Sequence, residues 1–291
     1  MSYSPRAMFP AERSSVRMVA VIVVVVVATA CAGVRGDNGV NGAGGDGGRG
    51  GRGGSTPPGG GRDGGPSPDA DNCDNELRAV VRDFRGFDLQ TASGTLPKHS
   101  DFEYAVADDR GIVMPALGAD SKPVYAGGAS GTPTTHSQQL FDQWYRDVDN
   151  VNIHFDVSIP LTADSARPGV FVYDSDLFFP IDDMGWGNQY QAHNYDFTTE
   201  IHFNFPYRGG EVFNFRGDDD LFLFVNGRLA VNLGGVHPAE MGSVDLDAQA
   251  ADLGIVRGTT YRIDIFQAER HVPGSTFHIE TTLQCIDNIV P

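Results

Sequence analysis

The chain has 291 residues, enough for one large domain or two small ones. Its 38 acidic residues outnumber its 21 basic residues, and the formal net charge is −17. This balance argues against nucleic acid and anionic lipid as partners, and it suits a surface that attracts cations.

The N-terminal stretch has the features of an export signal. Three arginines precede an apolar run from Met18 to Thr29, and small residues follow it. Because the run is short for a membrane span, we expect a signal peptide over residues 1–30; an uncleaved anchor helix is the alternative. The small residues before Cys31 resemble the lipobox of bacterial lipoproteins. That likeness implies lipidation of Cys31 and attachment to the cell envelope (outer membrane or cell surface) through this lipid alone.

Residues 31–72 have the composition of a linker. Paired glycines recur, prolines interrupt them, and no aromatic residue occurs. Such a segment cannot bury enough apolar surface to become ordered, so we expect a flexible tether.

From residue 73 to residue 291 the composition is that of a folded, β-rich domain. Apolar residues alternate with other residues in four segments, which predicts strands with one buried face. These segments are 151–159, 197–205, 261–265 and 277–283.

Two segments are apolar at consecutive positions, 221–225 and 229–233. They predict a hairpin that is covered on both faces. Asn226-Gly227 between them is a strong two-residue turn signal. Asn226 is also a candidate ligand-binding residue, although its position in the turn is enough to explain why an asparagine stands there.

One segment has bulky apolar residues at the spacing of an amphipathic helix. Apolar residues three and four apart predict a core-facing helix from about Ser137 to Val148. A second, short helix is predicted from Asp247 to Leu253. We therefore expect one all-β domain over 73–291, an antiparallel β-sandwich of jelly-roll-like type with a small helical insertion.

Three consecutive carboxylates, Asp218, Asp219 and Asp220, run directly into the predicted hairpin. Like charges side by side repel, and the repulsion grows where packing lowers the local dielectric. A hard cation such as Ca²⁺ offsets this repulsion most simply, so we predict that the three aspartates bind metal. A solvated acidic loop is the alternative reading.

Three further candidates lie near predicted strand ends. Glu269 and His271 follow the strand at 261–265, and His237 follows two glycines after the hairpin. One interpretation places all three at the rim of the sandwich beside the aspartates. The other is an internal ion pair, involving Arg270, that positions the loop.

The loop from Asp174 to Gly187 mixes carboxylates with aromatic residues. Trp186 offers a stacking face for a sugar ring, whereas an enzyme would use two of the carboxylates as acid and base. No HExxH, paired CxxC, phosphate-binding glycine loop or GxSxG motif occurs. We therefore expect no enzyme, with a carbohydrate-active hydrolase using loop carboxylates and Glu269 as the alternative.

Cys73 and Cys285 flank the predicted domain. Disulfides persist in exported proteins, and the two ends of a domain often lie close together. We predict a Cys73–Cys285 disulfide; two unpaired thiols are the alternative.

Several short motifs together resemble the fibro-slime domain, which occurs on exported, surface-associated proteins. The likeness extends from about Ala79 to Cys285. The motifs, in order, are GDDD at 217–220, NG at 226–227, LGGVH at 233–237, VDLD at 244–247 and AERH at 268–271.

The fibro-slime domain is similar in turn to the protective-antigen-type β-sandwich that fungal flocculins use as a calcium-dependent lectin. This resemblance implies that Asp218 and Asp219, joined by a cis peptide, bind one Ca²⁺ that also binds sugar hydroxyls. Neighbouring side chains of an extended strand point to opposite faces, so Asp218 and Asp219 can bind one ion only if the backbone kinks between them. The alternative is that Asp218 and Asp220, which lie on the same face, bind the ion without a kink. The implied function is calcium-dependent binding of surface or matrix glycans in adhesion, and a purely structural matrix protein is a further hypothesis.

Overall fold

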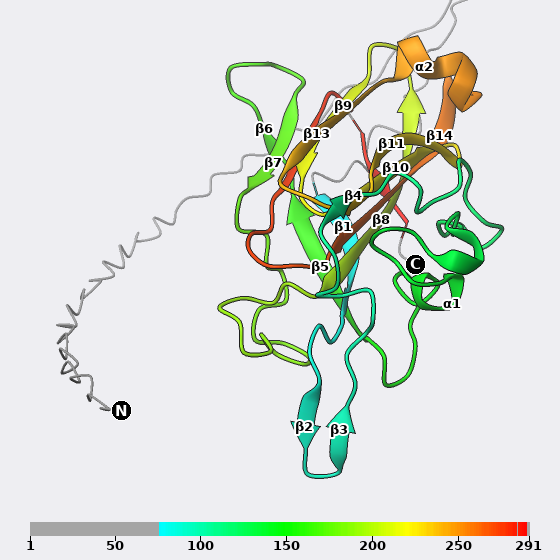
Figure 1. Cartoon of the computed structure of the whole chain (residues 1–291). Helices are drawn as coiled ribbons and strands as arrows, with labels where there is room; N and C mark the ends of the chain where they lie inside the picture. Colours follow the sequence, from blue (N-terminus) through cyan, green and yellow to red (C-terminus); the bar gives the residue numbers. More distant parts are fainter. Residues whose placement is uncertain (1–75, 284, 290–291) are drawn as a thin grey trace, which may run out of the picture. The chain divides into compact units, whose positions relative to one another are not determined.

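The computed structural model in Figure 1 describes residues 76–283 and 285–289, which belong to one unit, Arg62–Pro291. The predicted signal peptide and tether, with Cys31 and Cys73, lie outside the described residues. Within the described residues, no helix combines the length and the apolar character that crossing a membrane requires.

Two antiparallel sheets form a sandwich, as predicted (Figure 1). The larger sheet consists of β1 (Glu76–Asp83), β5 (Ile153–Pro160), β8 (Phe197–Tyr207), β10 (Asp220–Val225), β11 (Arg228–Leu233), β14 (Thr259–Glu269) and β16 (Asp287–Asn288). Its order is β11-β10-β14-β8-β1-β5, and β16 pairs with β8. The smaller sheet consists of β6 (Thr162–Ala163), β7 (Phe171–Ser175), β9 (Val212–Gly217), β13 (Glu240–Asp245) and β15 (Phe277–Thr281). Its order is β13-β9-β15-β7-β6.

The remaining elements are short. They are β2 (Leu89–Thr91), β3 (Gly94–Leu96), β4 (Ala107–Asp108), β12 (Gly235–Val236), the 3-10 helix η1 (Gly128–Ser130), α1 (Gln138–Phe141) and α2 (Leu246–Leu253). β4 pairs with β12, and β2 pairs with β3 in a hairpin that projects at the lower end of Figure 1.

The first core lies between the two sheets. Phe203 and Phe205 of β8 face Phe213 and Phe215 of β9, and all four are buried. Because side chains alternate along a strand, one apolar face per strand suffices to build this layer. The alternation predicted for these segments is confirmed.

A second core lies on the outer face of the larger sheet, under a layer of loops and short elements between residues 84 and 150. Phe84, Phe102 and Trp144 of this layer belong to the same buried cluster as Phe224 and Phe266 of the sheet. All six residues of β10 are buried as a result, which confirms the prediction for the first arm of the hairpin. The second arm, β11, lies at the sheet edge and is partly exposed.

The helix predicted from Ser137 to Val148 begins as expected but ends early. Ser137 caps it, and α1 stops at Phe141. The following backbone forms separate turns, because the Asn152 side chain bonds to the backbone of this segment, accepting from Val148 N at 3.1 Å. The residues of the predicted core-facing stripe are nevertheless buried, Trp144 among them. α2 confirms the second predicted helix.

Polar side chains of β8 and its neighbours are also buried on the outer face of the larger sheet. Glu200 accepts from Arg82 Nη1 at 2.7 Å and from Lys122, and it contacts His202. His202 in turn lies 2.6 Å from the Asp264 carboxylate. Period-two alternation suggests that these polar residues face solvent, but the covering layer buries them.

Replacing Glu200 by glutamine is expected to remove part of the acid sensitivity of the fold. Burial alone raises the pKa of Glu200, but its contacts with His202, Lys122 and Arg82 lower it from 4.5 to about 2. A depressed carboxylate pKa stabilises the fold above pH 4.5, and the contribution, about 3 kcal/mol, is lost as the pH falls towards 2. Urea unfolding between pH 2 and 7 should show this loss in the wild type and not in Glu200→Gln.

The matched control is Glu76→Gln, because Glu76 forms an exposed pair with Arg78 at 3.6 Å. Exposed pairs contribute little, so this variant should keep the wild-type acid profile. An unchanged profile in Glu200→Gln would contradict the role assigned to the buried network.

Candidate functional site

The chain crosses from one sheet to the other at the predicted carboxylates. β9 ends at Gly217 in the smaller sheet, and β10 begins at Asp220 in the larger sheet. Asp218 and Asp219 form the crossing. Asp220 pairs with Ala268 of β14, so the antiparallel register brings the crossing beside the end of β14 at Glu269.

Asp220 is an ion-pair partner of Arg270. The two side chains are fully buried, with Asp220 Oδ2 2.5 Å from Arg270 Nε. Asp220 Oδ1 accepts from Gly235 N at 2.7 Å. Asp220 therefore does not line the pocket described below, and the prediction that three aspartates surround one ion reduces to Asp218 and Asp219. The ion pair predicted as one role of the AERH segment exists, and Arg270 is the residue that forms it.

Asp218 and Asp219 each accept hydrogen bonds from the backbone of neighbouring loops. Asp218 accepts from Thr276 N. Asp219 accepts from His237 N at 3.2 Å and from Arg270 N at 2.9 Å. The two carboxylates therefore hold the surrounding loops at one end of the sandwich.

The peptide bond between Asp218 and Asp219 is trans. Val272–Pro273 is the one cis peptide bond in the described residues. The cis bond implied by the resemblance to the flocculin lectins is therefore wrong for this chain. The change of direction that the pair needs comes instead from the passage of the chain between the two sheets.

A pocket of about 430 Å³ opens at this crossing. It brings together five of the predicted site residues: Asp218, Asp219, His237, Glu269 and His271. The structure thus brings these side chains together, and their role as ligands stays a prediction. The remaining lining residues are Val106, Val236, Pro238, Val272, Pro273 and Gly274.

Glu269 is the least compensated charge in this pocket. Its side chain is 1% exposed, and neither carboxylate oxygen has a hydrogen-bond partner of good geometry. Burial, reinforced by Asp219 and Asp218, raises the pKa of Glu269 well above its usual range, and the nearby Ser275 hydroxyl lowers it less. Burial also raises the pKa of Asp219 to about 8 and that of Asp218. The three acids thus share a site that disfavours negative charge unless a positive group enters.

Glycine shapes the loop that carries His237. Gly235 has a φ of +119°, and a Cβ there would lie 2.4 Å from Ala107 O. Only glycine fits this close approach of β12 to β4, and the resulting bend directs the His237 N–H to Asp219. The His237 ring nitrogens lie 2.9 Å from Pro238 O and 3.1 Å from Leu233 O.

The structure does not bring Asn226 or Trp186 to the pocket. Asn226 makes the turn at the far end of β10, about 20 Å along the strand from Asp220, and its side-chain amide donates to Leu253 O. Trp186 packs under the Arg85 guanidinium at 4.4 Å, so one of its faces is already covered.

The loop carboxylates considered for a hydrolase are engaged elsewhere. Asp176 pairs with Arg216 at 2.7 Å, and Asp182 contacts His193 at 2.5 Å. None of these residues lines the pocket. No carboxylate of the loop from Asp174 to Gly187 therefore lines this pocket together with Glu269.

The donor set of the pocket is rich in oxygen, which suits a hard cation such as Ca²⁺. In the part of the chain that the structure describes, however, no group of three or more His, Cys, Asp or Glu side chains is placed to hold a metal ion. A cation bound by Asp218 and Asp219 would need further oxygen ligands from water or from a bound molecule.

The apolar wall of the pocket was not predicted. Val236, Pro238, Val272 and Pro273 adjoin the two predicted histidines, whereas Val106 comes from the covering layer. The sequence signal for the first four is their position beside His237 and His271. Val106 lies in no motif, and only the packing of the covering layer brings it here.

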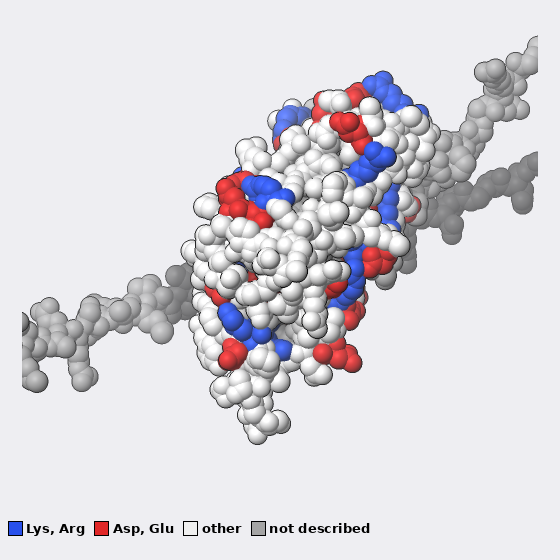
Figure 2. Space-filling model, turned by 45° about the vertical axis from the view of Figure 1, so that its right-hand side comes forward, with Lys and Arg blue, Asp and Glu red and all other residues white. Residues whose placement is uncertain are grey.

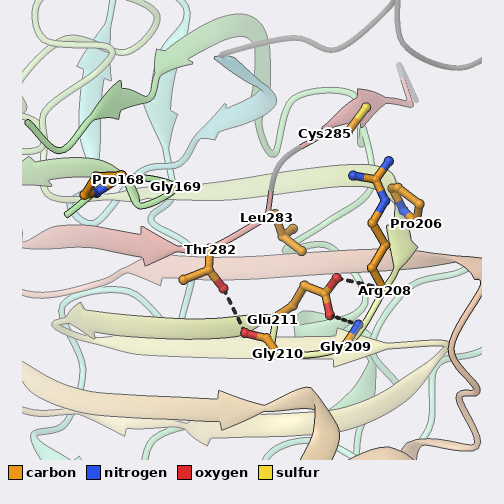
Figure 3. A pocket seen from close by; sticks show the side chains of 10 residues that line it. All are labelled: Pro168, Gly169, Pro206, Arg208, Gly209, Gly210, Glu211, Thr282, Leu283 and Cys285. Carbon is orange, nitrogen blue, oxygen red and sulfur yellow. Dashed lines mark hydrogen bonds between the residues drawn. The ribbon is translucent and has the colours of Figure 1, made fainter.

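A second pocket, of about 210 Å³, lies beside the end of β15 and is lined by the residues labelled in Figure 3. Its carboxylate, Glu211, already accepts from Arg208 N and Gly209 N at 2.7 Å each. Cys285 at this pocket is disulfide-bonded. Its predicted partner, Cys73, lies outside the described residues, so that pairing stays a prediction.

Charged residues on the face shown in Figure 2 lie in small groups of both signs around a broad uncharged area. Surface pairs in the described residues, such as Arg146 with Asp120 at 2.6 Å, also combine the two signs. The negative net charge is therefore not collected into one acidic patch on this face.

Relatives of the chain occur in Dictyostelium discoideum. The chain is 38% identical to protein psiQ over 188 residues, which cover 60% of this chain and 18% of psiQ. It is 35% identical to protein psiC over 208 residues, which cover 65% of this chain and 40% of psiC. The chain thus spans well under half the length of these relatives.

Among solved structures, the PA14 sugar-binding domain from an RTX adhesin aligns with 42% of this chain and 76% of its own, at 14% identity and a TM-score of 0.24. A similarity this low carries no argument about function. The match to a protein family is more direct and includes every pocket residue except Val106. Residues 165–290, which contain the sheet crossing and its carboxylates, match the PA14 domain.

Proposed function

We propose that this protein is an exported, non-enzymatic adhesion module that binds surface or matrix glycans through a calcium ion held by Asp218 and Asp219. The observation that carries the proposal is the pocket at the sheet crossing, where three carboxylates meet with no lysine or arginine among the lining residues. Buried charges of this kind are retained where a counter-charge binds them. The match of this region to the PA14 domain supports the same reading.

Calcium is the ion of choice because it accepts six to eight oxygen ligands in flexible geometry. Asp218 and Asp219 supply carboxylate oxygens, and the sugar hydroxyls and water supply the others. The requirement for outside ligands agrees with the finding that no three acidic or imidazole side chains in the described residues make a closed metal site. An open site of this kind makes the ion a bridge between protein and glycan.

The sequence supplies the setting for adhesion. The predicted signal, the lipid on Cys31 and the glycine-rich tether over 31–72 would hold the sandwich away from the membrane on the cell envelope. A binding pocket at one end of a tethered domain can reach glycans on a neighbouring surface or in a matrix.

A glycan array probed with the purified protein, in 5 mM calcium and in excess chelator, tests this proposal. We expect binding to at least one glycan class in calcium, loss of that binding in chelator, and loss in Asp219→Asn with calcium present. Asp176→Asn is the matched control, because Asp176 is an exposed partner of Arg216 outside the pocket. Binding that ignores both chelator and Asp219→Asn would contradict the calcium bridge, and no binding at all would favour a structural matrix role.

A further inference from the structure

The charge of the pocket is not balanced by its own lining residues. Asp218, Asp219 and Glu269 line it, and no lysine or arginine does. The other titratable lining residues are His237 and His271. The ring nitrogens of His237 lie beside carbonyl oxygens, and Nε2 also lies 3.3 Å from Arg110 Nη1. Those of His271 lie beside Val272 O and 3.6 Å from the Glu103 carboxylate.

Arg270, the residue after Glu269, does not line this pocket. Its guanidinium extends into the covering layer, where it pairs with Asp220 and donates to Asp101 O at 3.0 Å and Thr134 O at 2.9 Å. It also lies 4.6 Å from the centre of the Trp144 ring. Its charge lowers the pKa of Asp219, although less than burial raises it, and no hydrogen bond joins it to Glu269.

A single divalent ion leaves the Glu269 carboxyl of the pocket without a partner. The ion proposed at Asp218 and Asp219 compensates two carboxylates and leaves that of Glu269. Both Glu269 oxygens lack a hydrogen-bond partner of good geometry although the side chain is 1% exposed. A protonated amine suits this carboxyl, because its positive charge favours the ionised form of Glu269 and its three N–H groups can donate to the carboxylate oxygens.

The pocket is larger than an ion requires. Its volume is about 430 Å³, within the range of roughly 300–1,000 Å³ that small-molecule sites have. Its walls are apolar, formed by Val106, Val236, Pro238, Val272 and Pro273. Such walls suit the C–H faces of a sugar ring.

We propose that the preferred glycan unit is an amino sugar with a free amine, whose ammonium group binds Glu269 while its hydroxyls complete the calcium site. This inference rests on the proposed calcium-dependent function and names the sugar class for it. N-acetylation removes the positive charge and leaves Glu269 uncompensated. Uronic acids and sulfated sugars bring further negative charge to the same carboxylate.

Titration calorimetry in 5 mM calcium tests the inference on the full chain. The probes are the methyl glycosides of glucosamine, galactosamine and mannosamine, each compared with its N-acetylated and its 2-hydroxy counterpart. We expect at least one free amine to bind roughly 10- to 100-fold more tightly than both counterparts, as for a charge-assisted hydrogen bond in a buried site. Glu269→Gln should abolish this preference, and Glu280→Gln, outside the pocket, should keep it.

The outcomes separate the two proposals. Calcium-dependent binding of neutral or N-acetylated sugars with no preference for the amine would overturn the amino-sugar inference and leave the proposed function intact. If no sugar binds in calcium, both fall. Should Glu269→Gln fail to fold, the wild-type preference still decides, and Glu269→Asp, which keeps the charge, should retain a weaker preference for the amine.

Discussion

Replacing Arg270 by methionine is expected to lower the free energy of unfolding by about 3–5 kcal/mol, a large fraction of the stability of a typical domain. The substitution leaves Asp220 as a buried charge without a partner. It also removes the donors to Asp101 O and Thr134 O, which lie in the covering layer. Chemical denaturation followed by tryptophan fluorescence measures the loss, since Trp144 packs on the Arg270 guanidinium.

Two comparisons isolate the buried pair. Arg216→Met removes a partly exposed arginine that pairs with Asp174 and Asp176 on the smaller sheet, and it should cost less than about 1 kcal/mol. Adding Asp220→Asn to Arg270→Met should recover part of the lost stability, because the uncompensated charge is then gone. Equal losses for Arg270→Met and Arg216→Met would show that the pair does not hold the crossing in place.

Calcium is expected to raise the melting temperature of the wild-type protein, and Asp219→Asn is expected to abolish that response. Extracellular calcium sites bind with Kd values of roughly 10⁻⁴ to 10⁻³ M. At about 10 mM calcium, mass action then adds roughly 1.4–2.7 kcal/mol, a shift of several degrees for a domain of this size. Differential scanning calorimetry with and without chelator measures it.

The control for this experiment is Asp156→Asn, because the Asp156 side chain is 85% exposed and lies outside the pocket. Asp156→Asn should keep the full calcium shift. A wild-type melting temperature that does not depend on calcium, or an equal shift in Asp219→Asn, would count against a cation at the sheet crossing.

Local patterns predicted the elements well. The alternation over 197–205 is β8, and Asn226-Gly227 makes the hairpin turn with positive φ at both residues. Both signals depend on neighbours in sequence, which is why they can be recognised without the fold. The helix beginning at Ser137 was predicted too long, because the side chain of Asn152 reorganises the turns that follow it.

Long-range packing could not be predicted in the same way. Glu200 and His202 occupy the polar positions of an alternating strand, and only the layer between residues 84 and 150 buries them. Period two shows that a strand has two faces, and whether the second face is covered depends on segments far away in the chain.

The different contacts of the three aspartates also depend on long-range structure. Strand register pairs Asp220 with Ala268, and this places Asp220 beside Arg270 in the covering layer. The sequence shows the two motifs, GDDD and AERH, and the charges that they carry. The pairing of β10 with β14 decides which aspartate binds Arg270 and which two face the pocket. The two partners, Asp220 and Arg270, are 50 positions apart in the sequence.

A crystal structure of the protein grown or soaked in about 10 mM calcium tests directly whether a cation binds at the sheet crossing. We expect one calcium ion there, about 2.3–2.6 Å from carboxylate oxygens of Asp218 and Asp219, with water or sugar hydroxyls completing its shell. Asp218 and Asp219 bound to backbone amides alone, with no cation density in the pocket at that calcium concentration, would contradict it.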